Sequence, residues 1–239
     1  MPSFANYTQI AIVNKSTIIS DEDGSNMVLA LNLLLPKFCS NWGISLFTAV
    51  YVAKGVENLP AISYNINLLD DTDSPGTFAY HDISSDVPFA NVFAKTVLSE
   101  NGVILYEPTH KKPTVAQALS HEAFELIIDP RCNLWWMNYY TGQMVPGEVC
   151  DPVERNVVVV TLANDVKIGM SDWVLPSWTD AQNTTGPFNH LNTLRKPYEV
   201  KNGYLISSES INSVTNSQYH LNRPYNSRAV AIKAPLNKC

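Results

Sequence analysis

The N-terminal part of the chain shows two hydrophobic periodicities, one after the other. Residues 8–13 are mostly apolar and rich in β-branched side chains, which predicts a strand. Ser20 then offers a helix N-cap, and the acids directly after it suit a first helical turn. Apolar residues recur behind it at helical spacing, at Met27, Leu31, Leu34, Leu35 and Phe38. We expect this helix to end before Trp42, with a kink or an early end at Pro36.

Strand patterns follow this helix. Residues 44–53 alternate between apolar and polar positions, and residues 61–69 form a second run that a polar, proline-containing segment closes. A short edge strand is expected near 77–81. Because a further helix comes next, this order of elements predicts an α+β fold in which helices pack against a mixed sheet.

That further helix has well-marked ends. Thr114 is a credible N-cap, and Gln117 stands three residues later, where it would close a capping box. The apolar positions continue to Ile127, and Pro130 stops the pattern. Because the residue before a proline disfavours helical geometry, Asp129 should lie just outside the helix.

This helix carries the most informative polar pattern of the chain. His121 is followed directly by Glu122, and Glu125 comes four residues after the histidine. Side chains at i and i+4 share one helical face, and zinc proteases place two ligands at this spacing with a general-base glutamate after the first. Here the second ligand is a carboxylate instead of the usual histidine. An amphipathic helix with a polar face is the simpler interpretation of the same residues.

A further ligand is expected from a turn-rich segment downstream. Glu148 and Asp151 are the favoured candidates, and Cys150 between them is a third, since thiolate binds zinc well. Asp129 would either orient His121 or act as an extra ligand. A solvated turn is the simpler interpretation for any one of these acids.

These residues carry a resemblance. The pattern His-Glu-x-x-Glu-x-x-x-Asp-Pro, followed by a Glu-x-x-Asp segment at 148–151, is similar to a zincin-like, metalloprotease-like family of bacteria and their viruses. It is more distantly similar to plant phosphate-induced, exordium-type proteins. The likeness covers most of residues 8–205, with further matching segments at 76–82, 91–94, 133–135 and 174–178. It implies a zincin-like fold, a metal site, and an edge strand that pairs with an extended substrate near 78–80.

The function that follows is metal-assisted peptide hydrolysis. His121 and Glu125, with Glu148 or Asp151, would hold zinc, and Glu122 would act as general base. A site rich in carboxylates also suits Mn²⁺ or Ca²⁺. One alternative is a catalytically silent structural or interaction protein, such as a component of a virus particle. A second alternative is a module that captures a peptide or glycan without cleaving it.

Composition narrows the partners. Hydrophobic residues make up 45% of the chain and charged residues 16%, which allows a sizeable core. A net charge of −6 argues against nucleic-acid binding. The N-terminus shows no secretory signal, and no apolar run is long enough for a bilayer, so we expect a soluble protein, cytoplasmic or part of a virion.

The chain changes character beyond Trp178. We expect a zincin-like metal-binding domain at 1–178 and an irregular lobe or arm, rich in Asn and Ser, at 179–239. Short strands are expected at 198–200, 204–207 and 230–232. The tail from about residue 209 is expected to order against a protein partner.

The cysteines and the other histidines carry weaker signals. The four cysteines lack zinc-finger spacing and are expected to be reduced, although Cys132 and Cys150 both flank the predicted site. His81, on the expected edge strand, either lines a cleft or is a surface strand residue, and we favour the surface. The remaining histidines lie in polar or Pro-flanked loops and are expected to be solvated, namely His110, His190 and His220.

Overall fold

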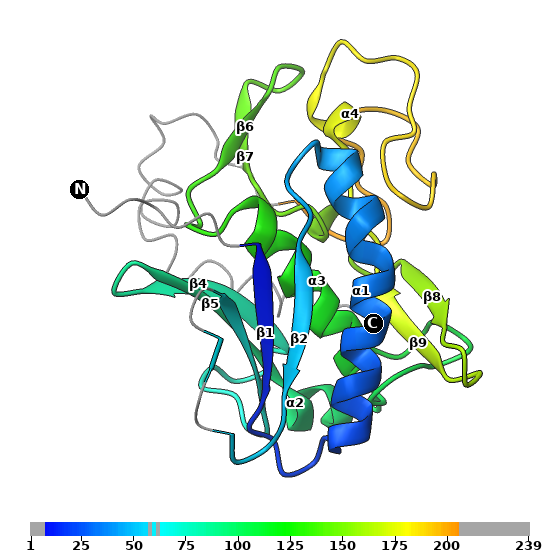
Figure 1. Cartoon of the computed structure of the whole chain (residues 1–239). Helices are drawn as coiled ribbons and strands as arrows, with labels where there is room; N and C mark the ends of the chain where they lie inside the picture. The colour runs from blue at the N-terminus through cyan, green and yellow to red at the C-terminus, as the bar shows by residue number, and fades with distance from the viewer. Residues whose placement is uncertain (1–7, 57–58, 61–62, 206–239) are drawn as a thin grey trace.

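A five-stranded mixed sheet forms the centre of the computed structural model, which describes residues 8–56, 59–60 and 63–205 (Figure 1). The strand order is β2-β1-β3-β5-β4. The first four strands in this order are parallel, and β4 runs antiparallel to β5. Their bounds are β1 Gln9–Asn14, β2 Thr48–Val52, β3 Tyr64–Leu69, β4 Ala79–Ser84 and β5 Val87–Phe93. The predicted α+β class and the strands predicted at 8–13, 44–53, 61–69 and near 77–81 are confirmed, with bounds that differ by a few residues. Strand β5, and the antiparallel direction of β4 beside it, were not predicted.

Helix α1 (Asp21–Trp42) begins as predicted. The hydroxyl of Ser20 accepts the N–H of Asp23 at 3.0 Å, and Gly43 ends the helix in the left-handed conformation with φ 62°. Of the kink or early end expected at Pro36, the early end is wrong, because the helix continues through the proline to Trp42, one residue beyond the predicted end. Leu35 and Phe38 are fully buried on either side of Pro36, so packing on the sheet holds the helix together where a backbone hydrogen bond is missing.

Helix α3 (Val115–Ile128) carries the polar motif and ends before Pro130 as predicted. The hydroxyl of Thr114 accepts the N–H of Gln117 at 2.9 Å. The side chain of Gln117 does not return to Thr114 but donates to the carbonyl of Glu154 at 2.7 Å. Only one of the two hydrogen bonds of the capping box is therefore formed. The side chain of Gln117 instead connects α3 to the segment around Glu154.

Both long helices cover the same face of the sheet (Figure 1). Alternate strand residues face α1 and α3 in one large core, for example Ile10, Ile12, Ile66, Leu68 and Val92. The opposite face carries a small cluster around Ala11, Val13 and Val52. Because β4 is the edge strand next to α3, side chains from β4 and α3 can meet inside the protein.

The rest of the described chain consists of short elements. Two hairpins follow α3, and the second packs on it through β9. The bounds are α2 Ala94–Ser99, β6 Trp135–Asn138, β7 Gln143–Pro146, the 3-10 turn Asp151–Val153, β8 Val157–Thr161, β9 Lys167–Ser171 and α4 Pro176–Thr179. The β8–β9 hairpin was not predicted from the sequence.

Residues 179–205 contain no strand apart from one isolated bridge at Asn189. The strand expected at 198–200 is wrong, because Tyr198 lies in a turn with φ 55°. Its hydroxyl lies within hydrogen-bonding distance of the carbonyls of Met137 and Thr179, at 2.7 and 2.6 Å, and its single proton can be donated to either. These contacts hold the segment against the hairpin β6–β7 and α4. Of the expected strand at 204–207 only the first two residues are described, and they are irregular. The strand at 230–232 and the tail from 209 lie outside the described residues.

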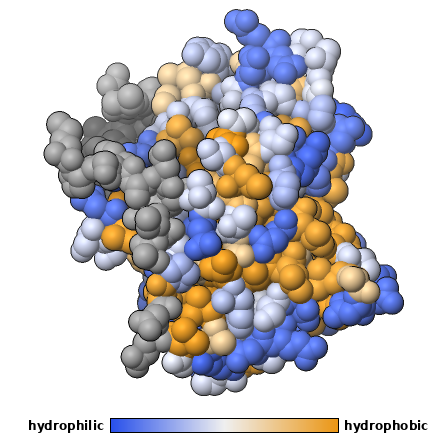
Figure 2. All heavy atoms as spheres, viewed as in Figure 1, coloured by the Kyte–Doolittle hydropathy of each residue, from blue (hydrophilic) through white to orange (hydrophobic). Residues whose placement is uncertain are grey.

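The surface is mixed in character (Figure 2). Hydrophobic residues reach the surface over α1 in this view, and on that helix Leu29 and Leu33 are 54% and 60% exposed. Among the helices that the structure describes, none is long and apolar enough to cross a membrane.

Candidate metal centre

Side chains from three segments that are far apart in sequence meet on one side of α3, and we call them the cluster. The helix contributes His121, Glu122 and Glu125, strand β4 contributes His81, and the loop and 3-10 turn after β7 contribute residues 148–151. All of these side chains are buried, with exposed fractions between 0 and 7%. Ionisable groups are rarely buried in such numbers unless they are paired or bind a cation.

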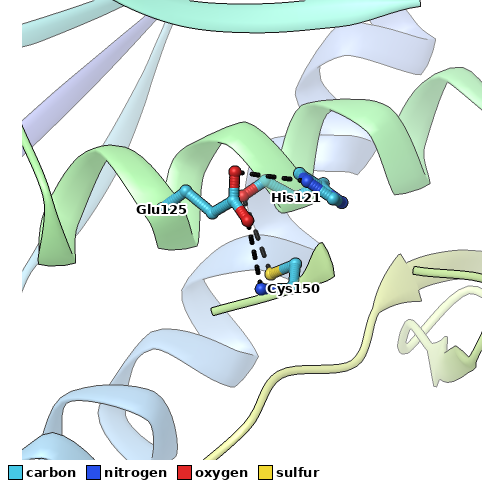
Figure 3. Close-up of side chains that lie close together, drawn as sticks. All are labelled: His121, Glu125 and Cys150. Carbon is cyan, nitrogen blue, oxygen red and sulfur yellow. Dashed lines mark hydrogen bonds and ion pairs between the residues drawn. The ribbon is translucent and has the colours of Figure 1, made fainter. Parts of the chain in front are cut away.

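The first group of potential ligands surrounds His121 (Figure 3). His121, Glu125 and Cys150 each offer one ligand atom, and these atoms lie within 4.8 Å of one another. The carboxylate of Glu125 lies between the other two: one oxygen is 3.2 Å from Nε2 of His121, and the other accepts the N–H of Cys150 at 3.1 Å. These buried groups could therefore hold a metal ion.

Asp151 approaches the same histidine from the 3-10 turn. Its Oδ1 lies 3.2 Å from Nε2 of His121 and accepts the hydroxyl of Tyr204 at 2.7 Å. Zinc bonds of about 2.0–2.1 Å place neighbouring tetrahedral ligands roughly 3.3 Å apart. The two carboxylate contacts of His121 have this spacing, so these donor atoms stand at distances compatible with a shared metal ion as well as with direct ion pairs.

The second group surrounds His81. Its Nδ1 lies 3.0 Å from Oε2 of Glu122 and 3.8 Å from Oε2 of Glu125, and these three residues again place ligand atoms within 4.8 Å of one another. Glu148 lies on the other side of the ring, with Oε2 3.9 Å from Nε2. Of the acids predicted as ligands, Asp151 thus contacts His121, whereas Glu148 lies at His81.

The favoured expectation for His81, a surface strand residue, is wrong, because its side chain is 0% exposed. Strand β4 alternates, so that Ala79 and His81 face α3 while Tyr80 and Asp82 face away. The sequence did contain this signal in the small residue two positions before the histidine. It could not show which helix would cover that face.

Asp129, predicted to orient His121 or to act as a ligand, accepts backbone hydrogen bonds in the turn after α3. It is 1% exposed, and its Oδ1 accepts the N–H groups of Asn133 and Leu134 at 2.8 and 3.0 Å. These bonds close the turn that leads from α3 into β6. The side chain of Asp129 thus helps to fix the path of the chain where it leaves α3.

The charges in the cluster shift one another's pKa. Burial, and then the nearby Asp151 and Glu148 carboxylates, raise the pKa of Glu125 to about 8 in spite of His121. Burial alone would lower the pKa of His121, but Glu125 and Asp151 raise it well above its ordinary value. Burial also raises the pKa of Asp151 and, strongly, that of the Cys150 thiol. Without a cation the cluster thus retains protons, and a bound cation would replace them.

A cleft opens onto part of this cluster. The residues that line it include His121 and Glu122 of α3, together with Ala79 at the start of β4 and Phe78 just before it. Three basic residues also line the cleft, together with acids: Lys111, Lys112 and Arg155 beside Glu100 and Glu154. Within the residues that the structure describes, the outer edge of β4 pairs with no other strand.

Cys150 is a further candidate ligand of the first group. From the sequence alone Glu148 and Asp151 are favoured over it, and in the structure its sulfur lies close enough to His121 and Glu125 to join them. Nothing in its spacing could show this, because the position depends on how the loop after β7 folds under α3. Cys39, Cys132 and Cys150 are all buried free thiols.

Solvation of the other histidines varies. His110 is exposed, whereas His190 is partly buried and stacks on Trp173 with ring centroids 4.0 Å apart. Burial lowers the pKa of His190. His220 lies outside the described residues.

None of the family models, curated proteins or solved structures compared with this chain matches it. The likeness to the zincin-like family therefore stays a prediction, and function has to be argued from the site.

Proposed function

We propose that this protein is a metal-dependent peptidase in which His121, Glu125 and Asp151 hold a zinc ion. The observation that carries the proposal is the position of two neighbouring residues. His121, which contacts both carboxylates at 3.2 Å, and Glu122 beside it are the members of the cluster that line the cleft. A cation on His121 would thus be reached from the cleft, next to a carboxylate that can accept a proton.

In the proposed hydrolysis each residue of the site has its own role. Zinc, when bound, supplies a Lewis acid that polarises the scissile carbonyl and makes water a better nucleophile. Glu122 accepts the proton of the attacking water and passes it to the leaving amine. Tyr204 orients Asp151 through its hydroxyl, and the N–H of Cys150 orients Glu125.

The edge of the sheet supports a peptide substrate. A chain in extended conformation could add to the outer edge of β4, beside Phe78 and Ala79, and thereby pass over His121 and Glu122. The combination of a mixed sheet, an antiparallel edge strand and the motif helix beneath it also supports the zincin-like fold that the sequence resemblance implies.

The donor set favours zinc over harder ions. Imidazole is a ligand that zinc accepts readily, and the first group offers the imidazole of His121 with the sulfur of Cys150 nearby. The carboxylates would also suit Mn²⁺ or Ca²⁺, but Ca²⁺ requires six to eight oxygen ligands. Zinc is therefore the ion we propose.

The test is a comparison of zinc-loaded wild type with Glu122→Gln on denatured casein and on a library of fluorogenic extended peptides. We expect the variant to retain its first zinc ion and to lose about 10²- to 10⁴-fold in rate, because it lacks the proton acceptor. Glu100→Gln, an exposed glutamate at the same cleft, is the matched control and should cleave like wild type.

Equal rates for wild type and Glu122→Gln would overturn the assignment of the base. A zinc-loaded wild type that cleaves none of the substrates would instead support the alternative of a silent structural or interaction protein.

A further inference from the structure

We infer that the cluster is built for two cations, with a second divalent ion held by His81, Glu122 and Glu125 beside the one on His121. This inference rests on the proposed function for its first site, and it adds a second site with its own ligands. The two groups of ligand atoms share one residue, Glu125.

The contacts of His81 define the second site. Its Nδ1 faces Oε2 of Glu122 at 3.0 Å and Oε2 of Glu125 at 3.8 Å. Ligands around a zinc or manganese ion stand roughly 3.0–3.4 Å apart, given metal–ligand bonds of about 2.1 Å. The three side chains would therefore need only small movements to close on an ion.

Glu125 is placed to bridge the two ions. Its Oε2 lies 3.2 Å from Nε2 of His121 and 3.8 Å from Nδ1 of His81, so one carboxylate group faces both imidazoles. Two-metal sites hold their ions about 3.5–4 Å apart, a distance that a shared carboxylate can span.

Glu148 explains how the ring of His81 would be oriented. A metal-binding histidine usually presents its second ring nitrogen to a carboxylate, which sets the tautomer and raises the basicity of the ligand. Glu148 lies on that side of His81, with Oε2 3.9 Å from Nε2. The acid that sequence reasoning predicted as a ligand of the first ion thus has a place as the supporting group of the second.

Charge balance gives an independent reason for two ions. Four carboxylates face the two imidazoles, and each is at most 5% exposed, namely Glu122, Glu125, Glu148 and Asp151. When both histidines bind as neutral ligands and Cys150 stays a neutral thiol, one divalent ion leaves two of the four negative charges uncompensated, whereas two divalent ions neutralise the four carboxylates. Buried net charge is strongly unfavourable, so the second ion removes a penalty that the first cannot.

The second ion would control the first site. Glu122 would be its ligand, and a carboxylate bound to a cation is a weak proton acceptor. We therefore expect hydrolysis to be fastest with one equivalent of zinc and to fall at least tenfold when the second equivalent binds.

The experiment is a calorimetric titration of metal-free protein with Zn²⁺, checked by elemental analysis after gel filtration. Wild type should bind two ions, and His81→Ala should bind one. His110→Ala, which removes an exposed histidine at the rim of the same cleft, is the matched control and should bind two. Glu122→Gln, a change of nearly equal size, should weaken the second ion at least tenfold and keep the first, which covers the case that His81→Ala does not fold.

Electron paramagnetic resonance after loading with Mn²⁺ adds a geometric readout. Two ions bridged by Glu125 should give an exchange-coupled spectrum in wild type and the spectrum of an isolated ion in His81→Ala. A single ion in wild type, with the same content in His81→Ala, would overturn this inference and leave the proposed peptidase intact. Two bound ions without hydrolysis at any loading would contradict the peptidase and leave the two-cation site standing.

Discussion

Two groups of buried acids in this protein are satisfied in different ways. Asp172 is 0% exposed, and four neutral donors bind its carboxylate. The side-chain amides of Asn156 and Asn189 donate at 2.9 and 2.6 Å, and the backbone N–H groups of Trp173 and Leu191 donate at 2.8 and 3.2 Å. Burial still raises the pKa of Asp172, while these hydrogen bonds oppose the rise.

The acids of the cluster beneath α3 lie next to other charged groups, whereas neutral donors surround Asp172. Glu125 accepts the N–H of Cys150, but its nearest charged neighbours include the acids Asp151 and Glu148 as well as His121. The chain therefore satisfies Asp172 by itself, whereas the cluster needs protons or cations from solution. Buried acids indicate a binding site only where the fold withholds neutral donors and gathers like charges.

Zinc should have the largest effect, and only on the cluster. At a free concentration a thousandfold above its dissociation constant, a bound ion stabilises the folded state by about 4 kcal/mol. For a chain of this size that corresponds to a rise in Tm of roughly 8–16 °C. Thermal unfolding with zinc and with a chelator measures it, and an identical Tm in both would show that the cluster binds no zinc.

Asp172→Ala should have the next largest effect, and it should not depend on metal. The substitution leaves buried donors of Asn156 and Asn189 without their acceptor, so we expect a loss of about 3 kcal/mol. Asp71→Ala, which breaks only an exposed pair with Lys95, should leave stability nearly unchanged, because water and salt screen such a pair. Urea unfolding of both variants, with and without zinc, separates structural acids from metal-dependent ones. A loss that zinc restores would contradict the distinction.

The stability of the metal-free protein should depend on pH through the acids of the cluster, in contrast to Asp172 with its four neutral donors. Folding raises the pKa of Glu125 from about 4.5 to about 8, so between these values the folded state holds a proton that the unfolded state has released. Its stability must then fall as pH rises through this window. His121, whose pKa is also raised, acts in the same direction because its proton is lost as pH passes its folded pKa.

We expect the metal-free protein to lose about 2 kcal/mol between pH 6 and pH 8, the effect of roughly one proton. Glu125→Gln should reduce this slope and remove much of the zinc effect. Urea unfolding at several pH values is the measurement, and stability that rises with pH in the metal-free wild type would refute the assigned shifts.

Tyr204→Phe should have the smallest effect on stability. It deletes the hydroxyl that donates to Asp151 at 2.7 Å, at a cost of about 1 kcal/mol. Loss of a group that orients a ligand typically weakens metal binding about 10- to 100-fold. Zinc affinity measured by competition with a chelating dye should therefore fall much more than stability does. An unchanged affinity would remove Asp151 from the ligand set.

Local signals explain which parts of the fold the sequence could predict. Ser20 and Thr114 correctly predicted the starts of two helices, because their hydroxyls form the N-caps, and Pro130 correctly predicted the end of α3. Pro36 led to a wrong prediction of an early end of α1, because its effect depends on packing contacts that the local sequence pattern does not contain. The run of valines in β8 was not recognised as half of a hairpin.

The residues of the site also differ in how far the local sequence could predict them. The i, i+4 spacing of His121 and Glu125 is local, and the structure brings both together with Asp151 from the predicted downstream segment. His81 lies 40 residues before His121 and reaches the cluster only because β4 is the sheet edge beside α3. Such a non-local partner leaves almost no trace in a single sequence.

The most direct test of the account is the metal content of the natively purified protein, measured by elemental mass spectrometry beside a His121→Ala/Glu125→Ala double variant and an Asp172→Asn control. We predict at least one zinc ion per chain in wild type and in the control, and none in the double variant. Equal metal content in all three, or none in wild type even after incubation with zinc, would contradict the claim that this cluster is a metal centre.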